Sequence, residues 1–404
     1  MIGRIILNNL IKKNTNTTPF LKFIYKKIKR IDIKEILWLD QIETHKILTL
    51  KQKKISLCYT PKIYKKNSNN EFISEIPEVN LYKFDEVILN SQSSNIATKN
   101  HVIFERVKNA DINYCNYATG IIRWHNHKKS ILRYNTKRVF VKKALFIGGN
   151  GVFNYYHWLI EISPKILQLK PETIEKYGIK YLIMDIRVKD IPSFQSIINM
   201  YLKEKKISLE LIYVNQNTDI FVKELFYINN ASNIVFNSKE VLSSPDFSFV
   251  SSEDIVKIRN TVFKHFPRSQ YKYPTKIFLA RKKDSARSYN QEEILDFFIS
   301  QGFEAIYLED HSFNEQINIF RAAEFIVGPS GAAWSNIIFC KSKCKAISWL
   351  PYHLSDFSVF STLAKYNHCD MHFIITNSNN PTDIHSSYSL NKDEIVKLYL
   401  SLII

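Results

Sequence analysis

One segment of the sequence places an imidazole and a carboxylate at a spacing suited to proton transfer. Residues 154–161 read Asn-Tyr-Tyr-His-Trp-Leu-Ile-Glu and follow the loop Gly148-Gly149-Asn150-Gly151. If a helix has begun here, His157 and Glu161 share one face because they are four residues apart. A carboxylate beside an imidazole raises its pKa and orients it, as a general base requires. A capped helix with a partly buried, hydrogen-bonded histidine fits the same pattern, and the pattern alone favours that alternative.

A second glycine turn has the chemistry of an anion site. Gly328-Pro329-Ser330-Gly331 follows an apolar strand and precedes a helical segment that starts at Ala332. Glycine permits positive φ and lets a ligand approach the backbone, and the N–H groups and dipole of a helix start favour phosphate. Neither glycine loop matches G-x-G-x-x-G or G-x-x-x-x-G-K-[ST], which argues against a dinucleotide-dependent dehydrogenase and a P-loop NTPase. Two tight turns without a ligand are the alternative.

Two arginines lie between these loops in a place where phosphate would be bound. Arg281, Arg287 and Asn290 follow the strand predicted at residues 277–280. Ligands of open α/β sheets bind at the carboxyl ends of the strands, and the planar, permanently charged guanidinium suits phosphate. The pair therefore predicts a diphosphate clamp, with ordinary solvated loop charges as the alternative.

Strand and helix signals alternate around both loops. The strands are predicted at 145–148, 181–185, 211–214, 225–228, 277–280, 303–308, 325–327 and 346–350, and the helices at 155–169, 191–202, 253–263, 290–300, after Ser312, and at 332–339. Asn290 with Glu293, and Ser312 with Glu315, form plausible capping boxes. Such alternation predicts parallel βαβ units. Residues 265–274, with two prolines and little apolar content, are the predicted linker between two of them.

The composition is that of a globular chain with a basic N-terminus. A length of 404 residues suits two domains, and 45% hydrophobic with 23% charged residues is ordinary for a folded protein. The formal net charge of +18 points first to a nucleic-acid binder. However, residues 1–70 hold 16 Lys and Arg against 4 Asp and Glu, a net +12, so the other residues carry only +6. This distribution argues against a nucleic-acid partner.

The N-terminal region also contains a candidate membrane-contacting helix. Thr17-Thr18-Pro19 is a good helix start, and apolar residues then recur at helical spacing among lysines, at Phe20, Leu21, Ile24 and Ile28. A basic amphipathic helix at 17–30 suits an anionic membrane surface, and a helix packed on the body with a solvated lysine face suits the pattern equally. No stretch approaches the ~20 apolar residues of a membrane span. We expect a cytoplasmic protein, because the five cysteines are scattered, as is typical of reduced thiols, and the N-terminus is a poor signal peptide. Residues 17–30 are the candidate contact to the inner face of the membrane.

The order of these motifs resembles glycosyltransferase family 61, and most closely its bacterial capsular-polysaccharide branch. The resemblance rests on Asn154-x-x-His157-Trp158-x-x-Glu161, Arg281…Arg287…Asn290, Ser312-x-x-Glu315-Gln316 and Ala323…Gly328-Pro-Ser-Gly-Ala332…Asn336, over roughly residues 140–350. It implies a GT-B architecture, which is an α/β fold with two Rossmann-like domains facing a cleft. The corresponding division is a basic N-terminal arm at 1–70, an acceptor-side domain at 71–264 and a donor-side domain at 265–404.

The resemblance also implies a reaction and a site. The implied reaction is an inverting, metal-independent transfer of a sugar from a nucleotide-diphosphate sugar, expected to be UDP-linked, to a hydroxyl of a growing capsular or lipopolysaccharide-type glycan. The sequence has no D-x-D motif, which agrees with a metal-independent reaction. No cofactor is expected besides the nucleotide-sugar co-substrate. Either His157 or Glu161 would deprotonate the acceptor, with His157 preferred. The arginines and the backbone at 330–332 would neutralise the departing diphosphate. The full expected donor-binding set is Arg281, Arg287, Asn290, Glu309, Gly328, Ser330, Gly331, Ala332 and Asn336, and the acceptor-side loop set is Gly149, Asn150, Gly151 and Asn154.

Two positions depart from the family pattern, and two alternatives stay open. Ser330 stands where the family usually has His, and Glu161 where it usually has Asp. The first departure leaves room for a membrane-docked glycan-assembly protein with a catalytically degenerate fold, and the net charge leaves room for a basic nucleic-acid-binding protein. His125-Asn126-His127 lacks the carboxylate or cysteine that would complete a metal site, so a surface strand pair is predicted there instead.

Overall fold

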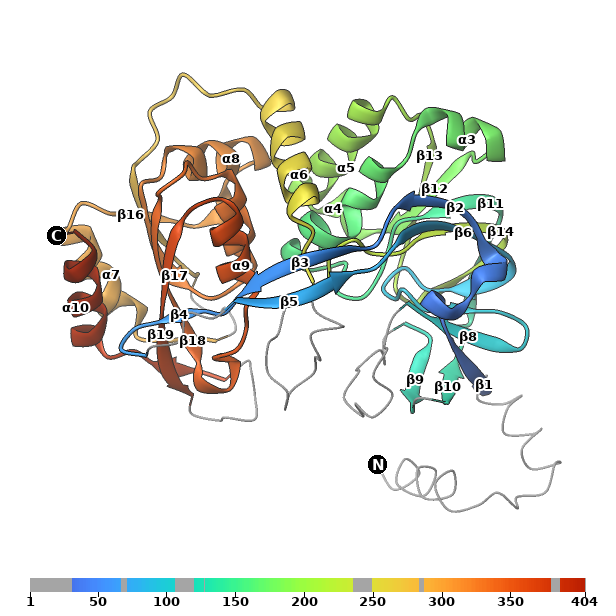
Figure 1. The fold of residues 1–404 in the computed structure, drawn as a ribbon, viewed down its shortest axis with the longest axis horizontal. Coiled ribbons are helices and arrows are strands. Elements are labelled where there is room, and N and C mark those ends of the chain that lie inside the picture. Colours follow the sequence, from blue (N-terminus) through green and yellow to red (C-terminus); the bar gives the residue numbers. More distant parts are fainter. Residues whose placement is uncertain are drawn as a thin grey trace, which may run out of the picture.

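The computed structural model describes residues 31–66, 71–105, 120–126, 128–234, 249–282, 287–378 and 386–403. In these residues the chain is a mixed α/β protein with two large sheets and helices packed against them (Figure 1), which confirms the predicted α/β class. The helix predicted at 17–30, together with Cys115 and His127, lies outside the described residues.

The first sheet has the strand order β13-β12-β11-β14-β6-β7-β8-β1-β10-β9, with β2 also paired to β6. Its strands are β1 Ile31–Trp38, β2 Lys46–Lys51, β6 Val79–Leu89, β7 Ile96–Ala97, β8 His101–Phe104, β9 Ile122–His125, β10 Lys129–Arg133, β11 Lys137–Phe146, β12 Tyr181–Asp185, β13 Glu210–Val214 and β14 Thr218–Ile228. The strands β13, β12, β11 and β14 are mutually parallel, as predicted. Continuous apolar runs make this possible, because parallel strands are buried on both faces; Leu182, Ile183 and Met184 of β12 are fully buried.

The second sheet has the order β16-β15-β17-β18-β19-β20, with β4 paired to β19. Its strands are β4 Lys62–Ile63, β15 Lys276–Leu279, β16 Glu304–Ile306, β17 Phe325–Pro329, β18 Lys345–Pro351, β19 Asp370–Ser378 and β20 Tyr388–Ser389. From β16 to β19 every pairing is parallel, which confirms the second predicted βαβ region.

Helices of several kinds cover the sheets. The longer ones are α3 Pro171–Tyr177, α5 Pro192–Lys205, α6 Ser252–His265, α7 Gln291–Ser300, α8 Phe313–Ala322, η6 Ala332–Phe339 (3-10), α9 Val359–Tyr366 and α10 Lys392–Ile403. The shorter ones are η1 Leu39–Gln41, η2 Glu43–His45, η3 His157–Ile162, η4 Ser163–Gln168, α4 Arg187–Asp190, η5 Leu308–Asp310 and η7 Tyr352–Leu354.

The segment predicted to be helical at 155–169 is helical, but it is not a regular α-helix. The segment is a π-helical turn, η3, followed by the 3-10 helix η4. Pro164 explains the break, because proline has no N–H to donate and its ring clashes with the carbonyl four residues earlier. Ser163 adapts to this by donating its hydroxyl to the Trp158 carbonyl at 2.6 Å.

Of the two predicted capping boxes, only one forms. At α8 the Ser312 side chain accepts from the Glu315 N–H, and the Glu315 carboxylate accepts from the Ser312 N–H, which confirms that box. At α7 the Asn290 side chain makes no cap hydrogen bond. Its Oδ1 accepts instead from the Leu390 N–H at 2.8 Å, so a distant segment takes the group that a cap would use.

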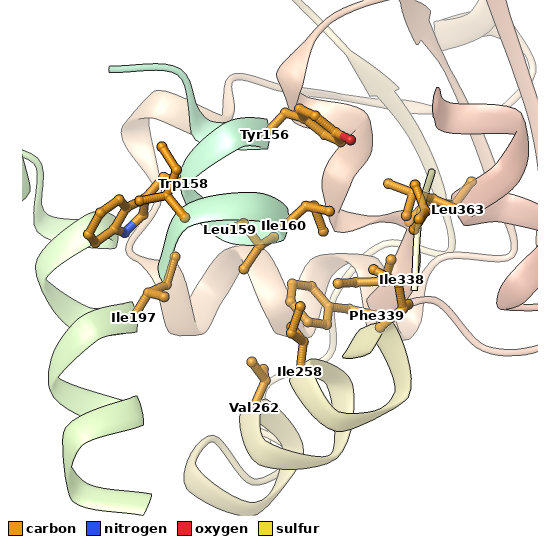
Figure 2. Packing of buried hydrophobic residues seen from close by; sticks show 14 of the residues in the cluster. Tyr156, Trp158, Leu159, Ile160, Ile197, Ile258, Val262, Ile338, Phe339 and Leu363 are labelled. Carbon is orange, nitrogen blue, oxygen red and sulfur yellow. The ribbon is translucent and has the colours of Figure 1, made fainter. Parts of the chain in front are cut away.

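N-terminal strands connect the two sheets. The ribbon of β3 Lys54–Tyr59 and β5 Glu71–Ile76 runs between them, and β4 pairs with β19 (Figure 1). Residues 31–63, within the segment predicted as a basic arm, therefore contribute β1 to β4. The domain boundaries at 70 and 264 stay predictions. One large apolar cluster continues from the first sheet to the helices of the second, and Figure 2 shows part of it around Trp158, Ile197, Ile258, Phe339 and Leu363.

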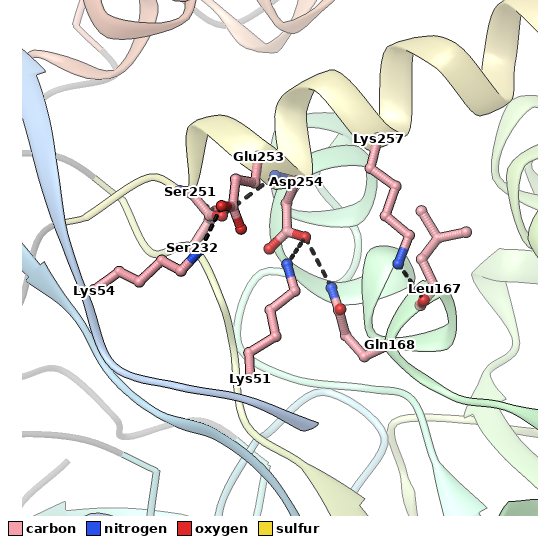
Figure 3. A network of polar contacts seen from close by, with 9 residues as sticks. All are labelled: Lys51, Lys54, Leu167, Gln168, Ser232, Ser251, Glu253, Asp254 and Lys257. Carbon is pink, nitrogen blue, oxygen red and sulfur yellow. Dashed lines mark hydrogen bonds and ion pairs between the residues drawn. The ribbon is translucent and has the colours of Figure 1, made fainter. Parts of the chain in front are cut away.

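The start of α6 is fixed by a polar network (Figure 3). The Ser251 hydroxyl accepts from the Asp254 N–H at 3.2 Å and caps the helix. The buried Asp254 carboxylate forms an ion pair with Lys51 of β2 and accepts from Gln168 of η4 at 3.0 Å. The helix predicted at 253–263 is thus confirmed, and its first turn holds β2 and η4 in place.

Candidate active site

The segment that carries His157 begins with an asparagine-capped turn. Asn154 Oδ1 accepts from the Tyr156 N–H at 2.9 Å, and the Asn154 carbonyl accepts from the Trp158 N–H at 3.0 Å. The apolar side of η3 is fully buried, with Trp158 and Leu159 inside the large cluster. Asn154 therefore shapes the loop, and the buried residues hold η3, which carries His157, against the core.

His157 and Glu161 form the predicted pair. His157 Nδ1 lies 2.5 Å from Glu161 Oε2, and the two side chains are 23% and 3% exposed. Because Nδ1 faces a carboxylate, we place its proton there, which leaves Nε2 as an acceptor. Burial alone would lower the pKa of His157, but the charge of Glu161 and the hydrogen bond to it outweigh burial and raise that pKa. The pair has the arrangement of a general base and its orienting carboxylate.

Gly151 packs against the His157 ring. Its φ is 75°, and a Cβ at this position would lie 2.4 Å from His157 Cδ2. Only glycine fits both the left-handed backbone and the contact with the imidazole. In the same loop Gly149 is buried and Asn150 is half-buried.

The glycines of the second loop do not use the positive φ that glycine permits. Gly331 is extended with φ 171°, and Gly328 is outside the positive-φ region. A Cβ at Gly328 would lie 2.7 Å from Leu279 Cβ, so this glycine permits the close packing of β17 on β15.

Arg281 connects the loop that follows β15 to the loop that follows β17, at the carboxyl edge of the second sheet. In chain order β15 is followed by β16 on one side of it and by β17 on the other, so the strand order reverses between β15 and β17. Ligands of open α/β sheets bind at such a reversal. Arg281, after β15, donates from Nη2 to the Ser330 carbonyl after β17 at 2.7 Å, and from Nη1 to the Arg287 carbonyl at 2.9 Å.

Arg287 is a half-buried cation with one buried nitrogen. Its φ is 62°, and its Nε is buried without a hydrogen-bond partner among the residues that the structure describes. Burial, and then the neighbouring Arg281, lower the pKa of the Arg287 guanidinium. Two adjacent guanidinium groups of this kind favour an anionic ligand, because each is stabilised by the negative charge.

The other predicted donor-side residues lie in several different places. Ser330, Gly331 and Ala332 lie at the Arg281 loop, and Glu309 is exposed in η5 after β16. Asn290 borders a pocket of about 580 Å³ together with Arg281 and Tyr307, although its amide also binds residue 390. Asn336 is fully buried.

Asn336 contacts the base segment rather than open space. The Tyr155 hydroxyl donates to Asn336 Oδ1 at 2.6 Å, and Asn336 Nδ2 lies 3.5 Å from Gln316 Oε1. This contact brings the His157 segment and the helix after the 328–331 turn together. Tyr155 is not among the predicted site residues, and its signal in the sequence is its place inside the Asn154–His157 motif.

The described ranges contain neither a metal-binding cluster nor a membrane-spanning helix. In them no three His, Cys, Asp or Glu side chains are grouped so as to hold a metal ion. Nor does any helix there combine the length and apolar character of a membrane span. Cys58, Cys340, Cys344 and Cys369 are buried free thiols.

A comparison with protein families covers this part of the chain. Residues 155–347 match the family described as Glycosyltransferase 61. The matched range contains His157, Glu161, both arginines and the 328–331 turn, and it supports glycosyltransferase family 61, and thus a glycosyltransferase, for this part of the chain. A comparison with curated proteins found no match.

Proposed function

We propose that the chain is an inverting, metal-independent glycosyltransferase of GT-B architecture. It moves a sugar from a nucleotide-diphosphate sugar, UDP-linked, to a hydroxyl of a growing capsular or lipopolysaccharide-type glycan. The observation that carries the proposal is the pairing of a histidine–carboxylate base with a two-arginine site, joined by the Tyr155–Asn336 hydrogen bond. The family match supplies the reaction class.

The base acts on the acceptor. His157 Nε2 accepts the proton of the acceptor hydroxyl, and Glu161, bound to Nδ1, stabilises the imidazolium that forms. The hydroxyl oxygen attacks the anomeric carbon on the face opposite the diphosphate. A new C–O bond forms while the bond to the diphosphate oxygen breaks, so the configuration at the anomeric carbon inverts.

The arginine site acts on the leaving group. The broken bond leaves its electron pair on the diphosphate, and the positive charge of the half-buried Arg287 stabilises that negative charge. Arg281 is held by the Ser330 and Arg287 carbonyls, so the loop is positioned before the donor binds. Ser330 has no imidazole. The two guanidinium groups and the backbone at 330–332 therefore neutralise the negative charge of the departing diphosphate.

The cellular setting belongs to the same proposal. The protein is cytoplasmic and contacts the anionic inner face of the membrane through residues 17–30, where a lipid-linked glycan acceptor is accessible. The acceptor side lies in residues 71–264 and the donor side in 265–404, and nucleic acid is not a partner.

The test combines donor binding with turnover. Thermal shift and calorimetry with a panel of nucleotide-sugars, each with and without EDTA, should show binding of a UDP-sugar that survives the chelator. His157→Asn should bind the donor normally yet lose about 10²–10⁴-fold in kcat. NMR of the product should show the inverted anomer. Retention of configuration, chelator-sensitive binding or a fully active His157→Asn variant would contradict the corresponding part of the mechanism. Donor binding without transfer to any acceptor would favour the degenerate assembly protein.

A further inference from the structure

An apolar row crosses the outer face of β1, β10 and β9, the strands at one end of the first sheet (Figure 1). Ile33 of β1 is the register partner of Ile131 of β10, and Ile131 is the partner of Trp124 of β9. Register partners point to the same side of a sheet, so these three side chains form one row. Ile33 is 47% and Trp124 is 43% exposed, with the half-buried Ile131 between them. Leu37, four residues further along β1, is 37% exposed and extends the row.

The opposite face of the same strands is already packed. Its apolar residues are buried in one cluster that includes Ile36, Leu132 and Ile122. An antiparallel sheet that buries one face normally has polar residues on the other, because that face meets water. The apolar row departs from this alternation. Single exposed apolar residues are ordinary in proteins, whereas adjoining ones on neighbouring strands indicate a binding surface.

The charged residues around the apolar row are mainly basic. Lys129 and Arg133 lie on the same face of β10, on either side of Ile131, and both are exposed. Lys128, directly before β10, is exposed as well. Glu35, the acidic residue on this face of β1, is the register partner of Lys129. Apolar side chains flanked by basic ones suit an anionic lipid layer, which offers phosphate at its surface and hydrocarbon beneath it.

Trp124 gives the row a side chain suited to that boundary. Tryptophan is enriched where proteins meet the interface between lipid and water, because its ring is apolar and its N–H is polar. Trp124 lies on β9, the last strand in the order of this sheet. In contrast, the side chains of Trp158, Trp334 and Trp349 are buried, and Trp38 is half-buried. Trp124 is therefore the tryptophan placed to enter a lipid layer.

Charge disfavours two other occupants of the row. Residues 17–30, which lead directly into β1, contain five basic residues and no acidic one. Packing of this segment on the row would bring its positive charges close to Lys129 and Arg133, which is unfavourable. A second copy of the chain, paired through the same face, would likewise oppose basic residues to each other. An anionic lipid surface attracts both the segment and the row.

We propose that the outer face of β1, β10 and β9 docks on an anionic lipid surface, where the apolar row enters the interfacial region and Lys129 and Arg133 contact headgroup phosphates. This docking surface adds a second contact to the one proposed for residues 17–30. It rests on the membrane contact of the proposed function and not on the sugar transfer. Neither donor nor acceptor is needed to test it.

The test is vesicle binding by the 404-residue chain. Co-sedimentation with vesicles of phosphatidylcholine and phosphatidylglycerol should show binding that weakens with salt and is much weaker on phosphatidylcholine alone. Ile33→Ser combined with Trp124→Ser should lower the partition coefficient roughly tenfold or more, because two apolar side chains no longer enter the lipid. Lys129→Glu combined with Arg133→Glu should lower it by a similar factor on the anionic vesicles.

A matched control separates the row from surface apolarity in general. Ile299 of α7 is 52% exposed, close to the value for Ile33, so Ile299→Ser should leave vesicle binding unchanged. A second measurement follows insertion directly. Vesicles that contain brominated phosphatidylcholine should quench tryptophan fluorescence, and Trp124→Phe should keep most of the binding but lose most of the quenching. Unfolding midpoints should stay near wild type, because the substituted side chains lie on the surface.

Three outcomes would overturn the inference. Unchanged binding in the Ile33→Ser, Trp124→Ser variant, with binding lost in Lys26→Glu, Lys27→Glu, would leave residues 17–30 as the contact. A wild-type dimer in sedimentation velocity that becomes monomeric in the Ile33→Ser, Trp124→Ser variant would assign the row to a second copy. No binding of the wild type to anionic vesicles would remove both membrane contacts. Loss of sugar transfer with vesicle binding intact would instead count against the proposed reaction and leave the docking surface in place.

Discussion

The Tyr155 hydroxyl donates a 2.6 Å hydrogen bond to Asn336 Oδ1, across 181 residues of sequence. Tyr155 lies two residues before His157, and Asn336 lies in η6, directly after the 328–331 turn. The bond is in the interior, where Asn336 is fully buried and Tyr155 packs against Phe194 of α5. This contact therefore links the segment that carries His157 to the helix that follows the 328–331 turn.

Tyr155→Phe should destabilise the protein and disturb the site together. The buried Asn336 Oδ1 would lose its partner, at a cost of about 1–3 kcal/mol of unfolding free energy. Urea unfolding should show a lower midpoint, and kcat should fall with little change in donor affinity. Tyr271→Phe is the control, because Tyr271 is 71% exposed. A Tyr155→Phe variant with wild-type midpoint and kcat would show that the bond does not position the site.

Glu161→Gln should move the pH profile to lower pH. Glu161 raises the pKa of His157, so wild-type kcat/KM should rise through a limb above the ordinary imidazole value of about 6.5. Gln keeps the size of the side chain but removes the charge, and burial then lowers the pKa of His157. The limb should thus lie at a lower pH than in wild type, and the plateau value of kcat/KM should also be lower. An unmoved limb would mean that another group is titrating.

The same pair makes a pH-dependent contribution to stability. Because the folded-state pKa of His157 is raised, the pair stabilises the fold fully below the unfolded-state pKa and loses that effect as pH rises through the folded-state value. The difference in unfolding midpoint between wild type and Glu161→Gln should therefore shrink between acidic and alkaline pH. A difference that grows with pH would contradict the assigned sign.

Arg287→Met should weaken nucleotide binding and stabilise the ligand-free protein. Loss of a charged hydrogen-bond donor costs about 1.5–3 kcal/mol, so calorimetry should show UDP binding weakened roughly 10–150-fold. The buried Nε without a partner also disappears, so the unfolding midpoint without ligand should rise. Arg268→Met, at an exposed position, should change neither quantity. Full UDP affinity in Arg287→Met would remove this residue from the phosphate site.

Gly151→Ala should inactivate the protein without unfolding it. The new Cβ would meet His157 Cδ2 at 2.4 Å, so the ring must turn away from the acceptor. Such a displacement should lower kcat by tenfold or more. Gly302→Ala is a matched control, with φ +81° and no atom within 4 Å of the new Cβ. Both variants should lose about 1 kcal/mol of stability from backbone strain, whereas only Gly151→Ala should lose turnover. Equal loss of activity in both would indicate a general effect of strain.

The sequence by itself determined the elements whose signals are local. The strand Tyr181–Asp185 has its predicted bounds, because a short apolar run can be buried on both faces of a parallel sheet whatever its neighbours are. The Ser312–Glu315 box also formed as predicted, since its two partners are three residues apart. The i, i+4 spacing of His157 and Glu161 likewise brought them together, even on a π-helical turn.

Only the tertiary structure decided the groups whose partners are far away in the chain. Asn290 was predicted to cap a helix, but its side-chain oxygen accepts from the N–H of residue 390 instead. The partner of Asn336 Oδ1 is Tyr155, which no local pattern in the sequence indicated. The same holds for the buried Lys165. Its Nζ lies 3.8 Å from Oε1 of Glu105, which is 60 residues earlier in the sequence. The physical reason is common to all three. A polar group bonds the partner that burial brings to it, and spacing along the sequence reveals that partner only when it lies within a turn or two.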